Sequence, residues 1–169
     1  MKTSINKTFL ILSICFLCSC DHYKSPYFNE ILKSEKGNLR GVEIGTSIEN
    51  VKAAENVKFL KDEMPEYLYY DYQIDMGNGY TVTYDFSENN ELYEIEIAIY
   101  LDVIPDATIL FDDFSSFLNN NYKTGKKEED GYSTWNTTST LSGHHVAISM
   151  INDSEDYGFI TILVRDLDY

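Results

Sequence analysis

Three consecutive stretches of alternating apolar and polar residues constrain the fold of this chain more than any other feature. Every second residue is apolar between positions 68 and 74, between 80 and 86, and between 93 and 99. A period of two is typical of β-strands that bury one face and expose the other. The apolar positions are Leu68, Tyr70, Tyr72, Ile74, Tyr80, Val82, Tyr84, Phe86, Tyr93, Ile95, Ile97 and Ile99.

The segments between these strands predict an antiparallel arrangement. Residues 77–79 read Gly-Asn-Gly and residues 87–90 read Ser-Glu-Asn-Asn. Both supply the residue types that hairpin turns require. Three further strands are expected near residues 131–137, 143–151 and 158–165.

Two helices are also expected. Thr46-Ser47-Ile48-Glu49 has the form of a capping box with Thr46 as N-cap, and it predicts a helix over about residues 47–56. Pro105 suits the first turn of a second helix, which Lys123-Thr124-Gly125 should end. The apolar residues at helical spacing in this second segment are Leu110, Phe114, Phe117 and Leu118.

This order of elements predicts an α+β fold, with an antiparallel sheet of about six strands and two helices on one face. A unit of one helix and three strands occurs twice, with helices starting near Thr46 and Asp106, which suggests a structural duplication. Residue identity between the two halves is slight, so chance recurrence of common elements is the alternative. Residues 39–169 should form a single domain, with halves at 39–103 and 104–169.

The N-terminus has the layout of an export signal, which we assign to residues 1–19. Lys2 and Lys7 precede an apolar run that begins at Phe9. A helix from Phe9 to Cys20 would be only about 18 Å long, too short to cross a hydrocarbon core of about 30 Å. The polar residues 20–38 are interpreted as a tether.

Leu17-Cys18-Ser19-Cys20 resembles the lipobox of bacterial lipoproteins. The resemblance implies cleavage before Cys20, attachment of lipid to that residue, and anchoring to a membrane of the cell envelope, inner or outer. All three cysteines lie in the first twenty residues, so the mature chain would keep no disulfide, thiolate nucleophile or cysteine-based metal site. The alternative is an ordinary cleaved signal that contains cysteines.

The net charge of the chain limits the classes of molecule that it is expected to bind. The formal net charge is −15, and removal of residues 1–19 takes away Lys2 and Lys7 but no acidic residue, which gives −17. Nucleic acid and anionic membrane surfaces are poor partners for such a chain, because they are bound by clustered Lys and Arg. A cationic protein, a neutral glycan or a divalent cation is easier to accommodate.

Residues 40–47 read Arg-Gly-Val-Glu-Ile-Gly-Thr-Ser and precede a helix containing Val51, while residues 84–95 have the pattern of a hairpin. Over residues 39–101 the chain is similar to the beta-lactamase-inhibitor-like superfamily, which includes small outer-membrane assembly lipoproteins. The resemblance implies helices packed on one face of an antiparallel sheet and noncovalent protein binding through the open face. It transfers no functional residue, because this chain is far more acidic and lacks paired cysteines.

The sequence offers little support for catalysis. It contains no Gly-x-Ser-x-Gly elbow, no His-Glu-x-x-His motif and no phosphate-binding glycine loop. We therefore expect no enzyme, no catalytic residue and no cofactor. His144 and His145 are adjacent on an expected strand and should point to opposite faces, so they are not expected to share a metal ion, while His22 lies in the tether.

Acidic clusters occur at Asp62-Glu63, Asp112-Asp113 and 128–130. Such runs are usually solvated features that favour solubility. Weak calcium binding by one of them is the alternative.

The face of the first sheet opposite its apolar side is the candidate binding surface. Exposed tyrosines among carboxylates supply rigid, amphipathic contact area. The candidate residues are Tyr67, Tyr69, Asp71, Glu94, Glu96, Tyr100 and, as an extension of the surface, Trp135. The alternatives are that the tyrosines are ordinary cross-strand partners and that Trp135 belongs to the core.

These observations favour a membrane-anchored envelope lipoprotein that binds a protein noncovalently, as an assembly factor or an immunity-like inhibitor. The alternative is a glycan-binding accessory lipoprotein in which Tyr69, Tyr100 or Trp135 stacks on sugar rings. A hydrolase with dispersed acidic residues ranks lowest.

Overall fold

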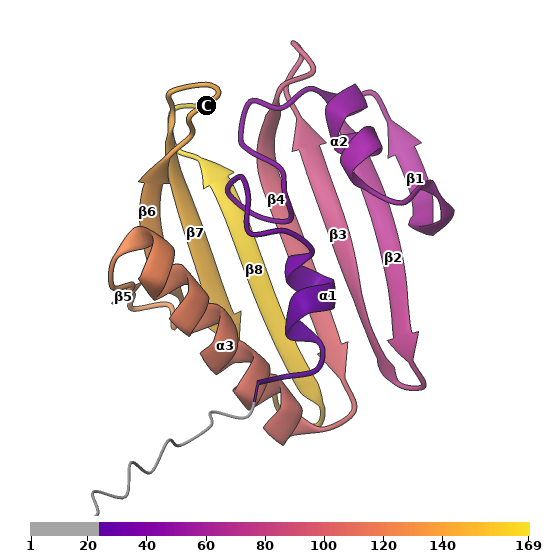
Figure 1. Cartoon of the computed structure of the whole chain (residues 1–169), viewed down its shortest axis with the longest axis vertical. Coiled ribbons are helices and arrows are strands. Elements are labelled where there is room, and N and C mark those ends of the chain that lie inside the picture. The colour runs from indigo at the N-terminus through magenta and orange to yellow at the C-terminus, as the bar shows by residue number, and fades with distance from the viewer. Residues whose placement is uncertain (1–23) are drawn as a thin grey trace, which may run out of the picture.

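The computed structural model describes residues 24–169. They form one eight-stranded sheet in which every neighbouring pair of strands is antiparallel, in the order β1-β2-β3-β4-β8-β7-β6-β5 (Figure 1). The strands are β1 (Leu60–Met64), β2 (Tyr67–Asp75), β3 (Asn78–Phe86), β4 (Leu92–Leu101), β5 (Lys126–Lys127), β6 (Ser133–Thr138), β7 (His145–Asn152) and β8 (Gly158–Asp166).

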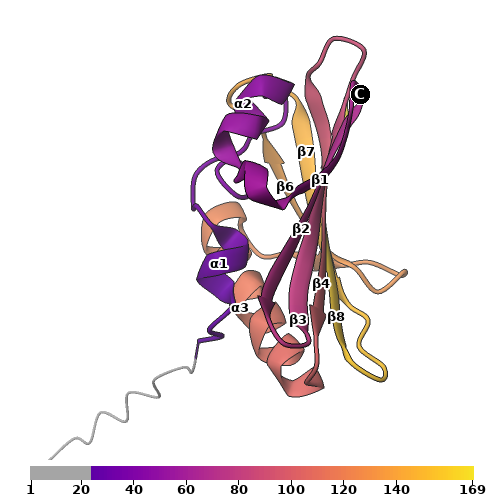
Figure 2. The same cartoon turned by 90° about the vertical axis from the view of Figure 1, so that its right-hand side faces the viewer.

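All the helices of the described residues lie on one side of this sheet, and the other side carries none (Figure 2). They are α1 (Phe28–Leu32), α2 (Ile48–Ala54), the 3₁₀ helix η1 (Val57–Phe59) and α3 (Ile104–Tyr122). The core lies between these helices and the sheet. Because each strand has one face buried against the helices and one face exposed to solvent, apolar and polar residues alternate in the sequence.

The predicted sheet of about six strands with two helices is wrong, because the described residues hold eight strands and three α-helices. The additional strands β1 and β5 are short and lie at the two edges of the sheet. β1 is largely exposed and β5 has only two residues, so neither shows an apolar alternation. The predicted unit of a helix and three strands is also wrong, since each half places four strands after its helix.

The segment from residue 25 to residue 38 is part of the domain and not a tether. Phe28, Ile31 and Leu32 on α1 are buried, and the rings of Phe28 and Phe114 lie 4.8 Å apart between centroids. The backbone N–H of Ser25 donates to Asp113 Oδ2 at 2.6 Å. A helix of five residues is too short to be stable alone, so packing against α3 holds it, and its sequence signal is weak.

The helix boundaries follow the prediction only in part. The N-cap of α2 is Ser47, without a side-chain hydrogen bond, so the predicted capping box is wrong. Thr46 Oγ1 instead accepts a hydrogen bond from the backbone N–H of Glu43 at 3.4 Å. The end of α3 agrees with the prediction, since the helix stops at Tyr122 and Lys123 adopts a positive φ of 70°.

The two halves of the chain meet at the centre of the sheet, where β4 pairs with β8. Ile97 lies opposite Ile162, and both are fully buried. The three strands predicted for the second half correspond to β6, β7 and β8 within about two residues at each end. The continuous sheet gives the molecule one broad surface that no helix covers.

Candidate binding face

The side of the sheet without helices is termed the open face. Six of the seven predicted binding residues lie on it, because their strand neighbours Leu68, Tyr70, Tyr72, Ile95 and Ile97 are buried on the helix side. Cross-strand register places the residues of the open face in rows. They are Tyr67, Tyr69, Asp71 and Gln73 on β2, Thr81, Thr83 and Asp85 on β3, Glu94, Glu96, Ala98 and Tyr100 on β4, and Phe159, Thr161, Leu163 and Arg165 on β8.

Carboxylates dominate the β2–β4 part of the open face. Asp85 lies directly opposite Glu94, and Glu96 follows two residues later on the same strand. Burial and the charges of Glu94 and Glu96 raise the pKa of the Asp85 carboxyl. Like charges placed opposite each other destabilise a sheet, so a cation bound beside them would relieve their repulsion.

Arg165 is the cation that the sheet itself provides on this face. Its Nε donates to Glu94 Oε2 at 2.6 Å across the β4–β8 pair. Among the described residues, no ion pair is found for Asp71, Asp85 or Glu96. The open face is therefore acidic after its internal ion pair is taken into account.

Tyr67 and Tyr69 border these carboxylates on β2. The hydroxyl of Tyr67 donates a hydrogen bond to Asp62 Oδ2 on β1, and this bond, together with burial and the charges of Asp62 and Glu66, raises the pKa of the phenol. Tyr69 lies in line with Thr83 and Glu96 across three strands. Both rings are only partly buried, so their faces remain accessible to a partner.

An aromatic cluster lies at the β2–β3 hairpin end of the open face. Tyr100 on β4 lies opposite Phe159 on β8, with ring centroids 5.1 Å apart. Tyr157, in the turn before β8, lies 6.3 Å from both rings. Tyr100 is 41% exposed and Tyr157 is 49% exposed, so these rings meet solvent although they contact each other.

Trp135 does not join the open face. Its side chain is only 3% exposed and lies in the hydrophobic core on the helix side. Its Nε1 donates to Asn119 Oδ1 on α3 at 2.8 Å. Trp135 faces inward because its strand neighbours Thr134 and Asn136 occupy the outer positions of β6.

A small cavity opens beside Arg165 on the β6–β8 part of the open face. Its volume is about 180 Å³, below the range of about 300–1,000 Å³ that is usual for sites of drug-sized ligands. Leu163, Thr134, Ser149, Asp130, Tyr132 and Arg165 line it. The cavity is large enough to hold one side chain of a bound protein.

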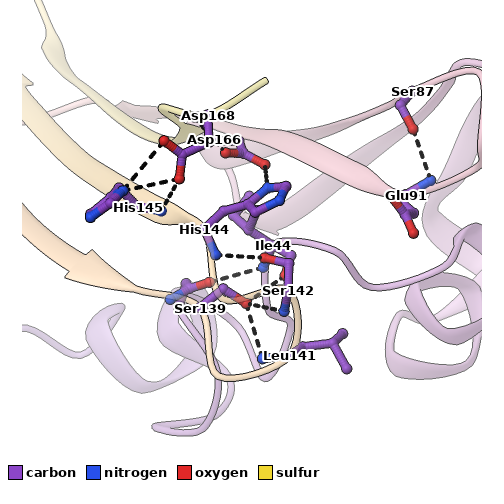
Figure 3. Close-up of polar contacts among 11 residues, drawn as sticks. Ile44, Ser87, Glu91, Ser139, Leu141, Ser142, His144, His145, Asp166 and Asp168 are labelled. Atoms are coloured by element: carbon purple, nitrogen blue, oxygen red, sulfur yellow. Dashed lines mark hydrogen bonds and ion pairs between the residues drawn. The ribbon is translucent and has the colours of Figure 1, made fainter.

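The two adjacent histidines each contact an aspartate of the C-terminal segment (Figure 3). His144 Nδ1 lies 2.7 Å from Asp166 Oδ2, and His145 Nδ1 lies 3.0 Å from Asp168 Oδ2. The hydrogen bond that His144 donates to the Asp166 carboxylate raises the pKa of the imidazole. The nearby negative charges add to this effect, and burial opposes it to a smaller extent. Within residues 24–169, no group of three or more His, Cys, Asp or Glu side chains is placed to hold a metal ion.

The serines drawn near His144 serve the β6–β7 turn. Ser139 Oγ donates to the backbone carbonyl of Ile44 at 2.7 Å and accepts from the N–H groups of Leu141 and Ser142 (Figure 3). Ser142 Oγ accepts from the backbone N–H of His144 at 3.3 Å. These bonds fasten the turn to the first half of the chain.

Sequence reasoning missed a buried ionic cluster beneath α1 and α2. The carboxylate of Glu55 accepts from Arg40 Nε at 2.9 Å and Nη2 at 3.0 Å, from Lys33 Nζ at 2.6 Å and from the Tyr72 hydroxyl at 2.6 Å. Tyr84 donates a further hydrogen bond to it. Burial raises the pKa of the Glu55 carboxyl, but the hydrogen bonds and charge of Arg40, aided by Lys33 and Tyr72, outweigh burial and hold it at about 2.

The acidic clusters differ in their environments. Asp62, Glu63, Glu129 and Asp130 are exposed, as expected for solvated carboxylates. Asp113 is instead buried and receives the N–H of Ser25. This carboxylate fixes the start of the folded domain to α3.

Comparison with models of known protein families, with curated proteins and with solved structures finds no match. Among the described residues, no helix has the length and apolar character needed to cross a membrane. The geometry of the open face is therefore the principal guide to function.

Proposed function

We propose that this chain is an envelope lipoprotein, held to a membrane by lipid on Cys20, and that its open face binds a cationic protein noncovalently. The observation that carries the binding role is the combination of accessible tyrosines with carboxylates that have no cation of their own, on a sheet surface without helices. Interfaces are enriched in tyrosine, and complementary charge steers association. An assembly factor or an immunity-like inhibitor would use such a face.

The proposed anchor agrees with the position of the first residues of the domain. Ser25 is buried, so residues 20–24 would link the lipid to the domain and reach at most about 17 Å. α1 follows directly and lies on the helix side of the sheet (Figure 2). A lipid attached there would leave the opposite, open face directed away from its point of attachment and accessible to a partner.

The anchor is tested by mass analysis of the native protein. We expect an N-terminal peptide that begins at Cys20 and carries acyl chains. A Cys20→Ala variant should move to the aqueous phase in detergent partitioning, whereas the matched Cys18→Ala variant should stay in the detergent phase. A peptide that still contains Met1, or a free thiol at Cys20, would contradict the anchor.

The binding role is tested by photo-crosslinking in intact envelopes. A crosslinking residue at Thr83, in the middle of the open face, should capture one defined protein with a basic surface. The same residue at Asn120, an exposed position of α3, is the control and should not capture that protein. Glu96→Lys should abolish capture at Thr83, because it replaces a negative charge of the open face by a positive one. We expect this substitution to leave the fold unchanged.

Two outcomes would contradict the binding role. Equal capture from Thr83 and Asn120 would mean that the open face is not the contact surface. Capture at Thr83 that persists after Glu96→Lys would mean that charge complementarity does not guide the interaction.

A further inference from the structure

The aromatic cluster Tyr100, Tyr157 and Phe159 is the part of the open face with the most specific chemistry. Three rings lie within 6.3 Å of one another, and two of them carry hydroxyls and are more than two-fifths exposed. Contiguous exposed apolar patches are characteristic of interaction sites. This cluster is therefore the candidate contact point of the open face.

Two strand positions next to Tyr100 on this face carry small residues. Its cross-strand partner is Gly79, and the preceding residue of β4 on this face is Ala98. A Cβ at position 79 would lie only 2.8 Å from the carbonyl oxygen of Tyr72, so glycine is required there by the backbone. Ala98 is only 8% exposed, whereas 41% of the Tyr100 side chain remains accessible.

A carboxylate lies near these two small residues. Gly79 lies opposite Gln73, and Asp71 is the next residue of β2 on the open face. Diagonal neighbours across two strands lie about 7–8 Å apart, which is within the reach of a long side chain bound over Gly79. Asp71 is exposed and forms no ion pair with any residue of the described part of the chain.

The same combination of groups binds an arginine inside this molecule. The guanidinium carbon of Arg40 lies 5.2 Å from the ring centroids of both Tyr72 and Tyr80, and the Glu55 carboxylate receives two of its N–H groups. The backbone carbonyl of Ile31 accepts a further hydrogen bond from Arg40 at 2.5 Å, so two tyrosine rings, one carboxylate and this carbonyl together hold the guanidinium. The open face offers tyrosine rings and a carboxylate to an arginine from outside.

Arginine fits this site better than lysine. The guanidinium is planar, stacks on aromatic faces and is more weakly hydrated than an ammonium group, so it loses less on leaving water. A neutral sugar could stack on Tyr100 as well, but it would make no use of the net acidity of the face.

We propose that the partner places an arginine side chain over Gly79, where it stacks on Tyr100 and pairs with Asp71. The rings of Tyr157 and Phe159 contact Tyr100 from the β8 side and hold it in place. This inference rests on the proposed binding of a cationic protein and names the side chain that anchors it. Asp85, Glu94 and Glu96 add longer-range attraction from the neighbouring rows.

Two synthetic peptides of equal charge, hexa-arginine and hexa-lysine, test the inference by calorimetric titration of the purified domain at low salt. We expect hexa-arginine to bind more tightly, by up to about two- to fivefold, which is the full value of one exposed cation–π contact. Tyr100→Leu and Tyr157→Leu should remove this preference while leaving the binding of hexa-lysine unchanged. Asp71→Asn should weaken binding of both peptides.

Tyr169→Leu is the matched control. Tyr169 is an exposed tyrosine that stacks on Tyr93 with centroids 4.1 Å apart, away from Gly79, so its removal should leave the preference for arginine intact. Circular dichroism of each variant confirms that the fold is kept. Because the replaced rings are on the surface, we expect folded variants.

The outcomes separate the inference from the proposed function. Equal affinities for the two peptides, or a preference that survives Tyr100→Leu and Tyr157→Leu, would overturn the arginine site but keep a cationic partner. Failure of both peptides to bind, or binding insensitive to Glu96→Lys, would overturn the cationic partner itself. Binding of chitohexaose that depends on Tyr100, without a preference for arginine, would replace the arginine site by a glycan site.

Discussion

The helix side of the sheet is built in two different ways in the two halves of the chain. Beneath α1 and α2, the strands β2 and β3 direct Tyr72, Tyr80 and Tyr84 toward the buried Arg40 and Glu55. Beneath α3, the strands β6, β7 and β8 direct only apolar groups and one indole toward the helix. These inward residues are Trp135, Val146, Ile148, Met150, Ile160, Ile162 and Val164.

The difference follows from the lengths of the covering helices. α3 has nineteen residues and buries Ala107, Leu110, Phe114 and Leu118, so apolar burial holds it to the sheet. α1 and α2 have five and seven residues, and α2 buries only Val51. The comparison teaches that the first half adds a buried ionic cluster to the apolar packing of its short helices, whereas the second half relies on the packing of one long helix.

The largest expected effect is the loss of the buried ion pair. Arg40→Met leaves the Glu55 carboxylate buried without its main partner, and removal of one partner of such a pair costs about 3–5 kcal/mol. Urea denaturation should report this loss. Arg165→Met, which removes the exposed pair with Glu94, is the control and should cost less than about 1 kcal/mol; equal losses would mean that the two pairs do not differ.

The ion pair of Arg40 and Glu55 should make the stability of the first half depend on pH in the acidic range. The pKa of Glu55 in the folded protein is about 2, below its ordinary value of 4.5, so its contribution is present above pH 4.5 and is lost as pH falls toward 2. Glu55→Gln should flatten the pH dependence of stability in this window. An unchanged slope would assign the acid sensitivity to other carboxyls.

A core substitution in the second half should lower the free energy of unfolding by a similar amount, and this loss should not depend on pH. Leu110 on α3 is fully buried against the core, and Leu→Ala substitutions in cores cost about 2–5 kcal/mol through lost transfer energy and a residual cavity. Leu110→Ala should shift the urea midpoint equally at pH 7 and pH 3. A shift that depends on pH would remove the distinction between the two halves.

The parts of this architecture that follow a local period were predictable. Residues 68–74, 80–86 and 93–99 alternate strictly, and the structure places Tyr69, Asp71 and Glu96 on the open face and the apolar members on the helix side, except Tyr93. A register shift between β3 and β4 puts Leu92 in the buried position predicted for Tyr93. Hairpin turns between consecutive strands then determine which strands are neighbours. Most of the candidate face could therefore be derived from the sequence.

The remaining features depend on contacts distant in the chain. Arg40 pairs with Glu55 only because α1, α2 and β2 converge, and no local pattern encodes that meeting. The partners of Tyr100 in its cluster, Tyr157 and Phe159, belong to the other half. Trp135 sits in a strand whose other residues are all polar, so alternation does not reveal which face it occupies.

A smaller effect is expected at Asn119 on α3, whose side chain accepts two hydrogen bonds. Asn119 Oδ1 accepts from Trp135 Nε1 at 2.8 Å and from the backbone N–H of Gly125 at 3.0 Å. Asn119→Ala leaves these two donors without an acceptor and should cost about 1–3 kcal/mol. Unfolding followed by the fluorescence of Trp135, the single tryptophan, measures this, and Asn119→Asp, which keeps an acceptor, should cost less.

The smallest expected effect lies at the C-terminal segment, where pH acts in the opposite direction to Glu55. The raised pKa of His144 means that its pair with Asp166 stabilises the segment fully below pH 6.5 and weakens as pH rises through the folded pKa. NMR titration should give His144 a midpoint above 6.5, and Asp166→Asn should lower that midpoint. Asp168→Asn should lower it less, because Asp168 affects His144 through its charge alone. If both variants shift the midpoint equally, the hydrogen bond to Asp166 is not the cause of the raised pKa. The charges of the C-terminal aspartates would then raise the pKa of His144 without a specific hydrogen bond.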